Sequence, residues 1–375
     1  MRAWEQIALG DVLHLHYGKA LDSSLRDSEG SVPVYGANGI KDHAEVALTT
    51  GPVLVIGRKG SAGEVTRVDG PLWPLDVTYY TEHDKERVEF DFLEYMLRVL
   101  DLPALAKGVK PGINRNDVYS LEVSLPLLGE QKRIVAKLDQ AFAALDRARA
   151  NAEANAADLS QLRDSIISTS LESALDACSK KIRLGELCAI ARGGSPRPIS
   201  KFLTDDPQGI NWIKISDATA SGKFIERTKE RIIPEGASRS RYVTSGSFLL
   251  TNSMSFGRPY ILRTNGCIHD GWLVLEPDYK QVDQEYLYYL LGSRQVYGEF
   301  DRLAAGSTVR NLNIDLVSRV SIRLPPLEKQ RETVASIVVA VGAVDKLVKV
   351  NERKLADLTT LRQSLLQAAF SGQLS

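Results

Sequence analysis

The stretch that decides the fold occurs twice in this chain. It reads LPLLGEQKRIV over residues 125–135 and LPPLEKQRETV over residues 324–334. An ungapped offset of 199 residues aligns the two copies and also matches Asp146 with Asp345. This period is far above the roughly 20 to 50 residues of a solenoid repeat. Each copy is therefore expected to be a whole domain followed by its exit helix.

Each copy of the stretch begins a long helix after a proline-bearing turn, which cannot continue a helix upstream. Roughly 45 residues at a rise of about 1.5 Å give a rod of about 70 Å, which needs a partner along its length. We expect two antiparallel, coiled-coil-like helical spacers over residues 128–178 and 327–375. Polar residues interrupt both heptad seams at matched positions, Asn155 and Lys354, which is typical of paired helices that fix their register. The predicted seam residues are Leu138, Ala141, Leu145, Ala148, Ala152, Leu159, Leu162 and Ile166 in the first helix, and Ile337, Ala340, Val344, Leu347, Asn351, Leu358, Leu361 and Leu365 in the second.

Two globular domains are expected, over residues 1–127 and 179–326. They begin alike, with LGDV at 9–12 and LGEL at 184–187, and then differ almost completely. Short β-branched runs broken by Gly, Pro and Asn predict strands joined by turns, so both domains are interpreted as α+β with a curved sheet. The fold class is two such domains separated by the two helices, an internal pseudo-twofold repeat. The expected strands include 52–56, 76–80, 211–215 and 247–250, and the expected helices include 90–100 and 284–297.

The composition is that of a soluble globular protein of two or three domains. The chain has 375 residues, of which 43% are hydrophobic and 25% charged. No apolar run approaches the roughly 18 residues that span a bilayer, and no secretory signal is visible at the start. Three scattered cysteines predict reduced thiols rather than a disulfide framework. A cytoplasmic location without membrane contact is expected.

Charge is distributed unevenly although the net charge is zero. Residues 179–275 carry 15 basic and 8 acidic side chains, a local excess that suits a polyanion. Residues 1–127 carry 13 basic and 19 acidic side chains, so a polyanion would need the basic ones gathered on one face.

Motifs for catalysis are missing from the sequence. It has no phosphate-binding loop, no dinucleotide fingerprint, no Gly-x-Ser-x-Gly elbow and no Asn/Asp-Pro-Pro-Tyr/Phe stretch. His14 and His16 would share one face of a strand but lack a third ligand, so no metal site is predicted. An active site within this chain is not expected.

The turns instead carry basic, amide, hydroxyl and aromatic side chains beside glycines. Arg and Asn side chains read bases in the major groove, Lys and hydroxyl groups hold phosphates, and glycine lets the backbone approach a duplex. These turns predict DNA binding. The candidate residues are Tyr35, Asn38, Lys41, Arg58, Lys59 and Ser61 in the first domain, and Arg192, Ser195, Arg197, Lys214, Arg239, Arg241, Asn252 and Arg258 in the second.

These features together resemble the specificity subunit of type I restriction-modification systems. The resemblance covers essentially the whole chain. It rests on the two helix starts, on VPVYGANGI at 32–40, and on GGSP at 193–196 with NWIKISD at 211–217. The first helix start departs from the second in having Leu127 where the second has Pro326.

The resemblance implies two target recognition domains, each reading one half of a split DNA site. It also implies that the helices dock two modification subunits, which carry S-adenosylmethionine and methylate adenine. Restriction subunits that use ATP and Mg would join through them. The chain itself would hold no cofactor and supply specificity without catalysis.

Because the two domains differ in sequence, the expected DNA site is bipartite and asymmetric. A quasi-twofold molecule presents its two readers to opposite strands, and a rod of about 70 Å suggests half-site centres about one to two helical turns apart. Two other interpretations stay open. One is a non-catalytic protein-interaction scaffold with two adaptor domains on a coiled-coil spacer. The other is a nuclease or methyltransferase in its own right, which the missing motifs disfavour.

Overall fold

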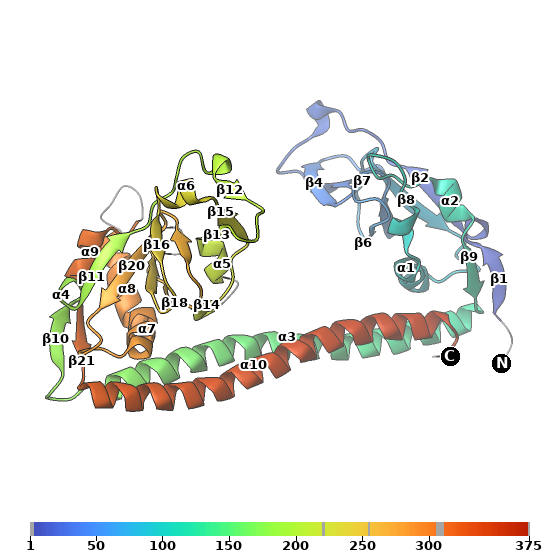
Figure 1. The fold of residues 1–375 in the computed structure, drawn as a ribbon. Coiled ribbons are helices and arrows are strands. Elements are labelled where there is room, and N and C mark those ends of the chain that lie inside the picture. The colour runs from blue at the N-terminus through green and yellow to red at the C-terminus, as the bar shows by residue number, and fades with distance from the viewer. Residues whose placement is uncertain (1–3, 220–221, 254–255, 305–310, 374–375) are drawn as a thin grey trace. The chain divides into compact units, whose positions relative to one another are not determined.

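A computed structural model of the chain describes residues 4–219, 222–253, 256–304 and 311–373. The chain forms two compact units, and each unit joins one globular domain to parts of both long helices (Figure 1). Unit 1 comprises Met1–Glu153 and Arg353–Ser375, and unit 2 comprises Ala154–Glu352. None of the helices in the described part of the chain is long and apolar enough to cross a membrane.

The domain of unit 1 is built on mainly antiparallel strands. A four-stranded sheet has the order β2-β8-β5-β6, and a three-stranded sheet has the order β4-β3-β7. Strand β5 is buried along its whole length, as expected for its run of β-branched residues. Leu54 and Ile56 of this strand pack in one core with Phe92 and Leu93 of helix α1. The elements are β1 (Glu5–Ala8), β2 (Leu13–Tyr17), β3 (Val32–Gly36), β4 (Gly39–Ala44), β5 (Val53–Gly57), β6 (Val65–Val68), β7 (Trp73–Pro74), β8 (Thr78–His83), α1 (Phe90–Val99), α2 (Arg115–Tyr119) and β9 (Glu122–Leu125).

The domain of unit 2 has two five-stranded sheets, ordered β11-β20-β17-β18-β14 and β12-β15-β13-β19-β16. The predicted α+β class is therefore confirmed. One prediction was wrong in detail: the helix expected over residues 284–297 is two helices, broken where Ser293 adopts an extended backbone. The elements are β10 (Lys180–Arg183), α4 (Leu184–Leu187), β11 (Cys188–Arg192), β12 (Leu203–Thr204), β13 (Ile210–Ile213), α5 (Ile215–Thr219), β14 (Phe224–Ile225), β15 (Glu230–Ile232), α6 (Pro234–Ala237), β16 (Arg241–Val243), β17 (Phe248–Thr251), β18 (Pro259–Leu262), β19 (Gly266–Ile268), β20 (Trp272–Pro277), α7 (Gln284–Gly292), α8 (Arg294–Ala304), α9 (Ile314–Arg319) and β21 (Ser321–Leu324).

Two long helices, α3 (Leu128–Ser173) and α10 (Leu327–Phe370), run antiparallel within each unit (Figure 1). In unit 1, Leu138 near the start of α3 shares a core with Ala369 near the end of α10. In unit 2, Leu171 near the end of α3 shares a core with Ile337 near the start of α10. Each domain thus rests on the first turns of the helix that follows it and on the last turns of the other.

One ion pair is made once in each unit. Arg362 Nη1 lies 2.6 Å from Asp146 Oδ1 in unit 1, and Arg163 Nε lies 3.6 Å from Asp345 Oδ1 in unit 2. The offset of 199 residues relates both arginines and both aspartates. Pairs as exposed as these contribute at most about 1 kcal/mol each, so they indicate register more than stability.

The predicted heptad seam holds only in part. Leu138, Ile337 and Val344 are buried, whereas Leu162 and Leu361 are 48% and 47% exposed. Asn155 and Lys354, expected to fix register across the seam, are exposed as well. Apolar spacing alone cannot tell whether a third element covers a helix pair, and in the middle turns Ala152 and Asn351 are buried whereas Leu162 and Leu361 are not. Leu347, also predicted on the seam, is 54% exposed.

A matched pair of strands joins each domain to its helix. In unit 1, β1 pairs antiparallel with β9, and in unit 2, β10 pairs antiparallel with β21. The LG dipeptide after the first strand of each pair is explained by close packing. A Cβ on Gly10 would lie 2.8 Å from Tyr119 Cβ, and one on Gly185 would lie 2.7 Å from Ser318 Cβ, which no larger residue tolerates.

The feature that both helix starts share is a buried glutamine that ties the helix to the domain. Gln131 Oε1 accepts a hydrogen bond from the backbone N–H of Glu89, the residue that caps α1. Gln131 Nε2 donates to the carbonyl oxygens of Arg87 and Pro126, at 2.8 Å each. The Gln131 side chain is fully buried, and its bond to the Pro126 carbonyl oxygen is buried with it.

Gln330 makes the same three bonds in unit 2. Its Oε1 accepts from the backbone N–H of Asp283, the cap of α7, and its Nε2 donates to the carbonyl oxygens of Gln281 and Pro325. Each partner occupies the position that its counterpart has in unit 1. The repeated stretch is therefore a joint between a domain and its helix.

We expect Gln131→Ala to lower the free energy of unfolding of unit 1 by about 2–4 kcal/mol, because three buried backbone groups lose their partner. Denaturant unfolding combined with hydrogen exchange at the Glu89 amide measures this. The control Gln140→Ala removes an exposed amide from the same helix and should change stability by less than about 0.5 kcal/mol. An unchanged exchange rate at Glu89 in the Gln131→Ala variant would contradict the assignment.

Candidate nucleic-acid interface

Two of the predicted segments meet in the domain of unit 1. Strands β3 and β4 form a hairpin whose turn contains Asn38 and ends at Gly39, which has a positive φ of 103°. The loop after β5 lies against this turn, since a Cβ on Gly57 would come within 3.2 Å of the Ala37 carbonyl oxygen. The structure thus brings the hairpin residues Tyr35, Asn38 and Lys41 near the loop residues Arg58, Lys59 and Ser61.

Arg58 is held in place by its own domain. Its Nε and Nη2 atoms donate to the Asp76 carbonyl oxygen at 3.0 and 2.6 Å. Its guanidinium lies 5.5 Å from the ring centre of Tyr17, and the guanidinium of Arg115 lies 5.1 Å from the same ring. Cation–π contacts of this kind fix two cations beside an aromatic ring that is 46% exposed.

A further basic loop lies next to Lys59 and is not among the residues predicted from the sequence. Isolated bridges join Gly112 to both Lys59 and Lys107, and the Gly60 amide donates to the Pro111 carbonyl. The loop reads KGVKPG over residues 107–112, with the Val109 side chain fully exposed at its tip. The sequence signal that could have predicted this loop is the pair of lysines in a turn that contains Gly and Pro.

Asp270 organises the cationic loops in the domain of unit 2. Ser195 Oγ donates to its Oδ1 at 2.6 Å, and Arg197 Nη2 lies 3.4 Å from its Oδ2. Arg192 Nε donates to the Asp270 carbonyl oxygen at 2.9 Å, and Arg241 Nε donates to the Arg192 carbonyl oxygen at 2.8 Å. Predicted residues from two separate stretches of the chain are therefore one cluster around Asp270.

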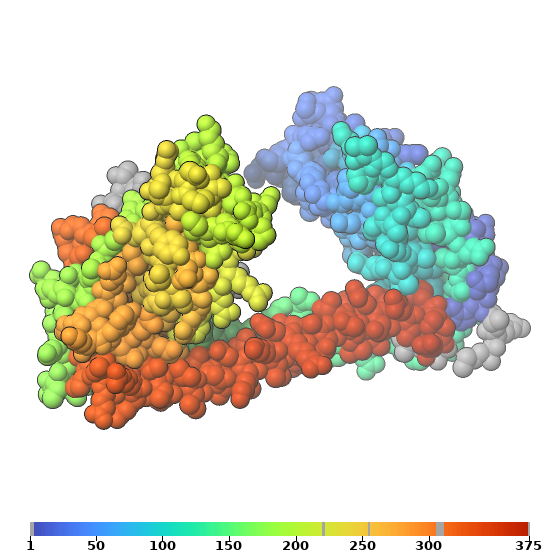
Figure 2. Space-filling model, in the orientation of Figure 1, coloured from blue at the N-terminus to red at the C-terminus, as the bar shows by residue number. Residues whose placement is uncertain are grey.

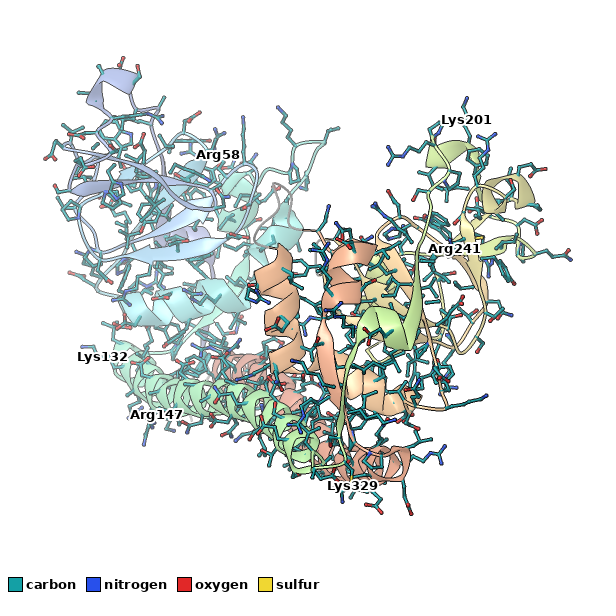
Figure 3. All side chains as sticks on the ribbon, turned by 90° about the vertical axis from the view of Figure 1, so that its left-hand side faces the viewer. Arg58, Lys132, Arg147, Lys201, Arg241 and Lys329 are labelled. Carbon is teal, nitrogen blue, oxygen red and sulfur yellow. The ribbon has the colours of Figure 1, made fainter. Side chains whose placement is uncertain are left out.

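The cluster surrounds a hollow in the surface. Arg192, Gly193, Gly194, Ser240, Arg241 and Tyr242 line a pocket of about 340 Å³. Arg239 lies next to it, with its guanidinium 5.4 Å from the ring centre of Phe202. Tyr242 is 55% exposed, so an aromatic face is presented beside the arginines. In unit 1 and in unit 2, Arg58 and Arg241 lie on the side of their domain away from the long helices (Figure 3).

Two predicted residues, Lys214 and Arg258, lie apart from this cluster, and a third, Asn252, lies behind it. Lys214 forms an ion pair with Glu230, and Asn252 is buried with Nδ2 donating to the Asp270 carbonyl oxygen. Arg258 lies over the ring of Tyr297, in a pocket that α3 and α8 also line. Asn252 is thus placed to support the cluster rather than to touch a base. Met254 and Ser255, which the same predicted turn contains, lie outside the described residues.

The histidine pair on β2 has carboxylate and aromatic neighbours. His16 Nε2 lies 2.7 Å from Glu82 Oε2, and its ring stacks on Tyr80 at 5.0 Å. In the described part of the chain, no group of three His, Cys, Asp or Glu side chains is placed to hold a metal ion. The contact with His16 lowers the pKa of the Glu82 carboxyl, so this carboxylate is charged at neutral pH.

Comparisons with known proteins agree with one another. The family model for the type I restriction modification DNA specificity domain matches residues 1–155 and 179–359. The specificity subunit of the Escherichia coli type I restriction enzyme EcoDI is 22% identical over 402 residues, covering 99% of this chain and 89% of that protein. A putative type I restriction enzyme specificity subunit of Haemophilus influenzae is 26% identical over 332 residues, covering 84% of this chain and 82% of that protein.

Solved structures share the fold at similar identity. A chain from a study of complex assembly and conformational transition of the type I R-M system has a TM-score of 0.76 at 21% identity, covering 100% of this chain and 99% of that one. The HsdS subunit from Thermoanaerobacter tengcongensis has a TM-score of 0.53 at 21% identity, covering 100% of this chain and 98% of that one. The family match spans most of the sequence, and the chain belongs to the type I restriction modification DNA specificity family.

We expect Asp270→Asn to loosen the loop that holds Ser195 and Arg197. The hydrogen bond from Ser195 lowers the pKa of the Asp270 carboxyl, so the carboxylate is charged at neutral pH and its bonds are lost only as pH falls through that lowered pKa. Amide exchange over residues 192–197 should become about three- to tenfold faster in the variant at neutral pH. Glu276→Gln, an exposed position on β20, is the charge-matched control and should leave these rates unchanged. Equal rates in all three proteins would contradict the role given to Asp270.

Proposed function

We propose that this chain is the sequence-reading subunit of a type I restriction-modification complex, with each domain reading one half of an asymmetric bipartite DNA site. One observation carries the proposal: two domains that are attached to their helices by the same glutamine joint have different clusters of cationic loops. We call the repeated joint, strand pair and long helix the frame. A duplicated frame that served only for stability would not require the two sets of loops to diverge in sequence.

In unit 1 the DNA-facing surface would be formed by the hairpin turn at Asn38, by Arg58 and Lys59, and by the lysine loop over residues 107–112. Residues 1–127 carry more acidic than basic side chains, but binding of a polyanion needs only one basic face. These cations would form that face. In unit 2 the surface would be the Asp270 cluster with Arg239 and Arg241. Arginine pairs with guanine edges, and lysine holds phosphates.

The partners follow from the same proposal. Double-stranded DNA would bind the loops, and two modification subunits would dock on the long helices, with restriction subunits joining the assembly. S-adenosylmethionine, ATP and Mg would belong to those partners, and this chain would supply no catalysis.

Helix α10 supports a docking role. Val339 and Val350 are 76% and 67% exposed, and they lie on the face of the helix opposite the buried Ile337 and Val344. The orange-red part of α10 in unit 2 is uncovered on the side shown in Figure 2. Exposed apolar side chains on one helix face are typical of a protein–protein contact. The equivalent positions of α3 are Gln140 and Asn151, so the two docking faces would differ in polarity.

The rival function is a protein-interaction scaffold without DNA. The two are separated by measuring the affinity of the assembled complex for DNA containing the recognised site and for scrambled DNA, as a function of salt. A sequence reader shows site selectivity together with a steep loss of affinity as salt rises. A scaffold shows neither.

Lys59→Ala should weaken methylation or binding of the first half-site and spare the second, and Arg241→Ala should do the reverse. Loss of a base contact costs about 1–3 kcal/mol, or about 5- to 150-fold, on the cognate half-site. The controls are Lys85→Ala and Lys280→Ala, which remove exposed lysines away from the clusters. A variant could instead lose affinity equally for all DNA sequences, with the slope of log affinity against log salt concentration becoming shallower by about one. The substituted residue would then contact phosphate.

Val339→Ser and Val350→Ser should weaken the association of a modification subunit with the chain by about tenfold when combined, because exposed apolar area is lost from the contact. Titration calorimetry or analytical ultracentrifugation with purified modification subunit measures this. Val46→Ser, which changes an exposed valine that follows β4 and lies outside both long helices, is the matched control and should leave the association unchanged. Undiminished association of the double variant would place the docking surface elsewhere.

A further inference from the structure

The base of the domain in unit 2 contains a pocket that the DNA-reading role does not use. It has a volume of about 490 Å³ and lies between the last turns of α3, the β10–β21 strand pair and helices α7 and α8. Ligand sites are typically about 300–1,000 Å³, so the pocket is large enough for a small organic molecule. Its apolar lining is Leu171, Leu175, Tyr286, Leu290, Val296 and Ile322.

Unit 1 provides an internal comparison, because the same place in its frame is filled. Phe92, the third residue after the cap of α1, packs against Phe370 of α10 with ring centres 4.9 Å apart. Tyr286 is the third residue after the cap of α7, and Leu171 is the equivalent of Phe370 by the offset of 199 residues. A smaller residue therefore leaves space in unit 2 where unit 1 has an aromatic pair.

One of the residues around this space is a buried tyrosine. Tyr286 has no exposed surface, and within the described residues its hydroxyl oxygen has no hydrogen-bond partner. Unpaired buried polar atoms are rare in folded proteins because they lose water without compensation. Burial raises the pKa of Tyr286 to about 12, so the group stays protonated and can donate a hydrogen bond.

Two cations stand at the mouth of the pocket without a carboxylate partner among the described residues. Lys181 of β10 and Arg323 of β21 lie directly opposite each other in the antiparallel pair, an arrangement in which like charges repel. Arg323 Nη2 reaches only the Asp176 carbonyl oxygen, at 3.4 Å. The equivalent pair in unit 1 is Gln6 and Ser124, which are neutral and hydrogen-bonded to each other at 2.6 Å.

Other charges at the rim leave the balance positive. Arg302 is paired with Glu299 at 2.8 Å, and Arg319 with Asp315 at 2.6 Å. Glu172 also lines the pocket. The pocket therefore combines an apolar wall with two adjacent cations free of an acidic partner among the described residues, and the unpaired hydroxyl of Tyr286 is buried behind that wall. That combination is complementary to a molecule with an apolar body and one anionic head.

We propose that this pocket binds a small amphipathic organic anion, with its carboxylate, sulfonate or phosphate head between Lys181 and Arg323 and its apolar body against Leu171 and Tyr286. The site belongs to unit 2 alone. It is independent of DNA recognition, and its occupancy would brace the end of α3 against the domain of unit 2.

The test uses the purified full chain, or its complex with modification subunits if the chain alone is insoluble. The probe is 8-anilinonaphthalene-1-sulfonate, an aromatic anion whose fluorescence rises in an apolar site. We expect one site per chain by titration calorimetry, with decanoate competing for it and inorganic phosphate alone competing weakly. Decanoate carries both chemical features, whereas phosphate carries only the anionic head.

The variants are taken from the protein's own unit 1. Lys181→Gln with Arg323→Ser recreates the neutral strand pair and should weaken probe binding at least tenfold. Leu171→Phe recreates the filled core and should abolish binding without lowering the unfolding temperature. Lys280→Gln, an exposed position outside the pocket, should bind like the unchanged chain.

Three outcomes would overturn the proposal. One is unchanged probe affinity in the strand-pair variant, which is a surface change that does not threaten the fold. Another is unchanged affinity in a folded Leu171→Phe variant. The third is complete displacement of the probe by purified modification subunit, which would mean that a partner segment fills the pocket. Loss of DNA selectivity would not bear on these results, because the measurement contains no DNA.

Discussion

A buried side-chain amide holds each domain on its helix, and the rest of the structure depends on it. Glutamine suits the position because its amide offers one acceptor and two donors on a side chain long enough to span from the helix to a neighbouring cap. A glutamate in its place would have nearly the same shape, but its carboxylate could not donate to two carbonyl oxygens at neutral pH. The proline before each helix supplies one of those carbonyls, at Pro126 and at Pro325. The repeated stretch is thus a compact joint in which a turn, a helix start and a domain helix share one set of buried hydrogen bonds.

The attachment of each domain to its helix does not involve the cationic loops. The largest core of each domain is built from strands, from α1 or α7, and from the first turns of a long helix. The cationic loops extend from the other ends of the strands, where substitutions leave the joint intact. A frame of this kind lets loops change while the attachment stays the same, which is the division that the two halves of this sequence display. The filled core in unit 1 and the open pocket in unit 2 show that the frame also tolerates different packing at its base.

The frame could be predicted from the sequence because its signals are local and repeated. The 199-residue offset, the heptad spacing and the proline-bearing turns locate both helices to within a few residues of Leu128–Ser173 and Leu327–Phe370. The seam was predicted as continuous, but Leu162 and Leu361 within it are exposed, because spacing does not reveal which turns a domain covers. Nothing near Gln131 in sequence points to Glu89, since that contact arises only from the packing of α1.

The candidate site was less predictable because it depends on contacts between distant segments. Lys107 and Lys110 join the site through the bridge from Gly112 to Lys59, which strand pairing creates and local sequence does not announce. Arg258 was grouped with Arg241 by its residue type, yet it lies beside Tyr297. Asp270, an acidic residue, escaped a search for cations although it positions several of them. Residues that hold a site together are often of the opposite charge to the residues that act.

The central claim, that two unlike readers on one duplicated frame recognise two different half-sites, is tested most directly by mapping methylated adenines. The map would compare genomic DNA from cells that carry the complete modification complex with DNA from cells that lack only this chain. We predict a methylated motif that disappears without the chain and consists of two different short sequences separated by a fixed non-specific spacer. A continuous or palindromic motif, or a map that does not depend on this chain, would contradict the claim.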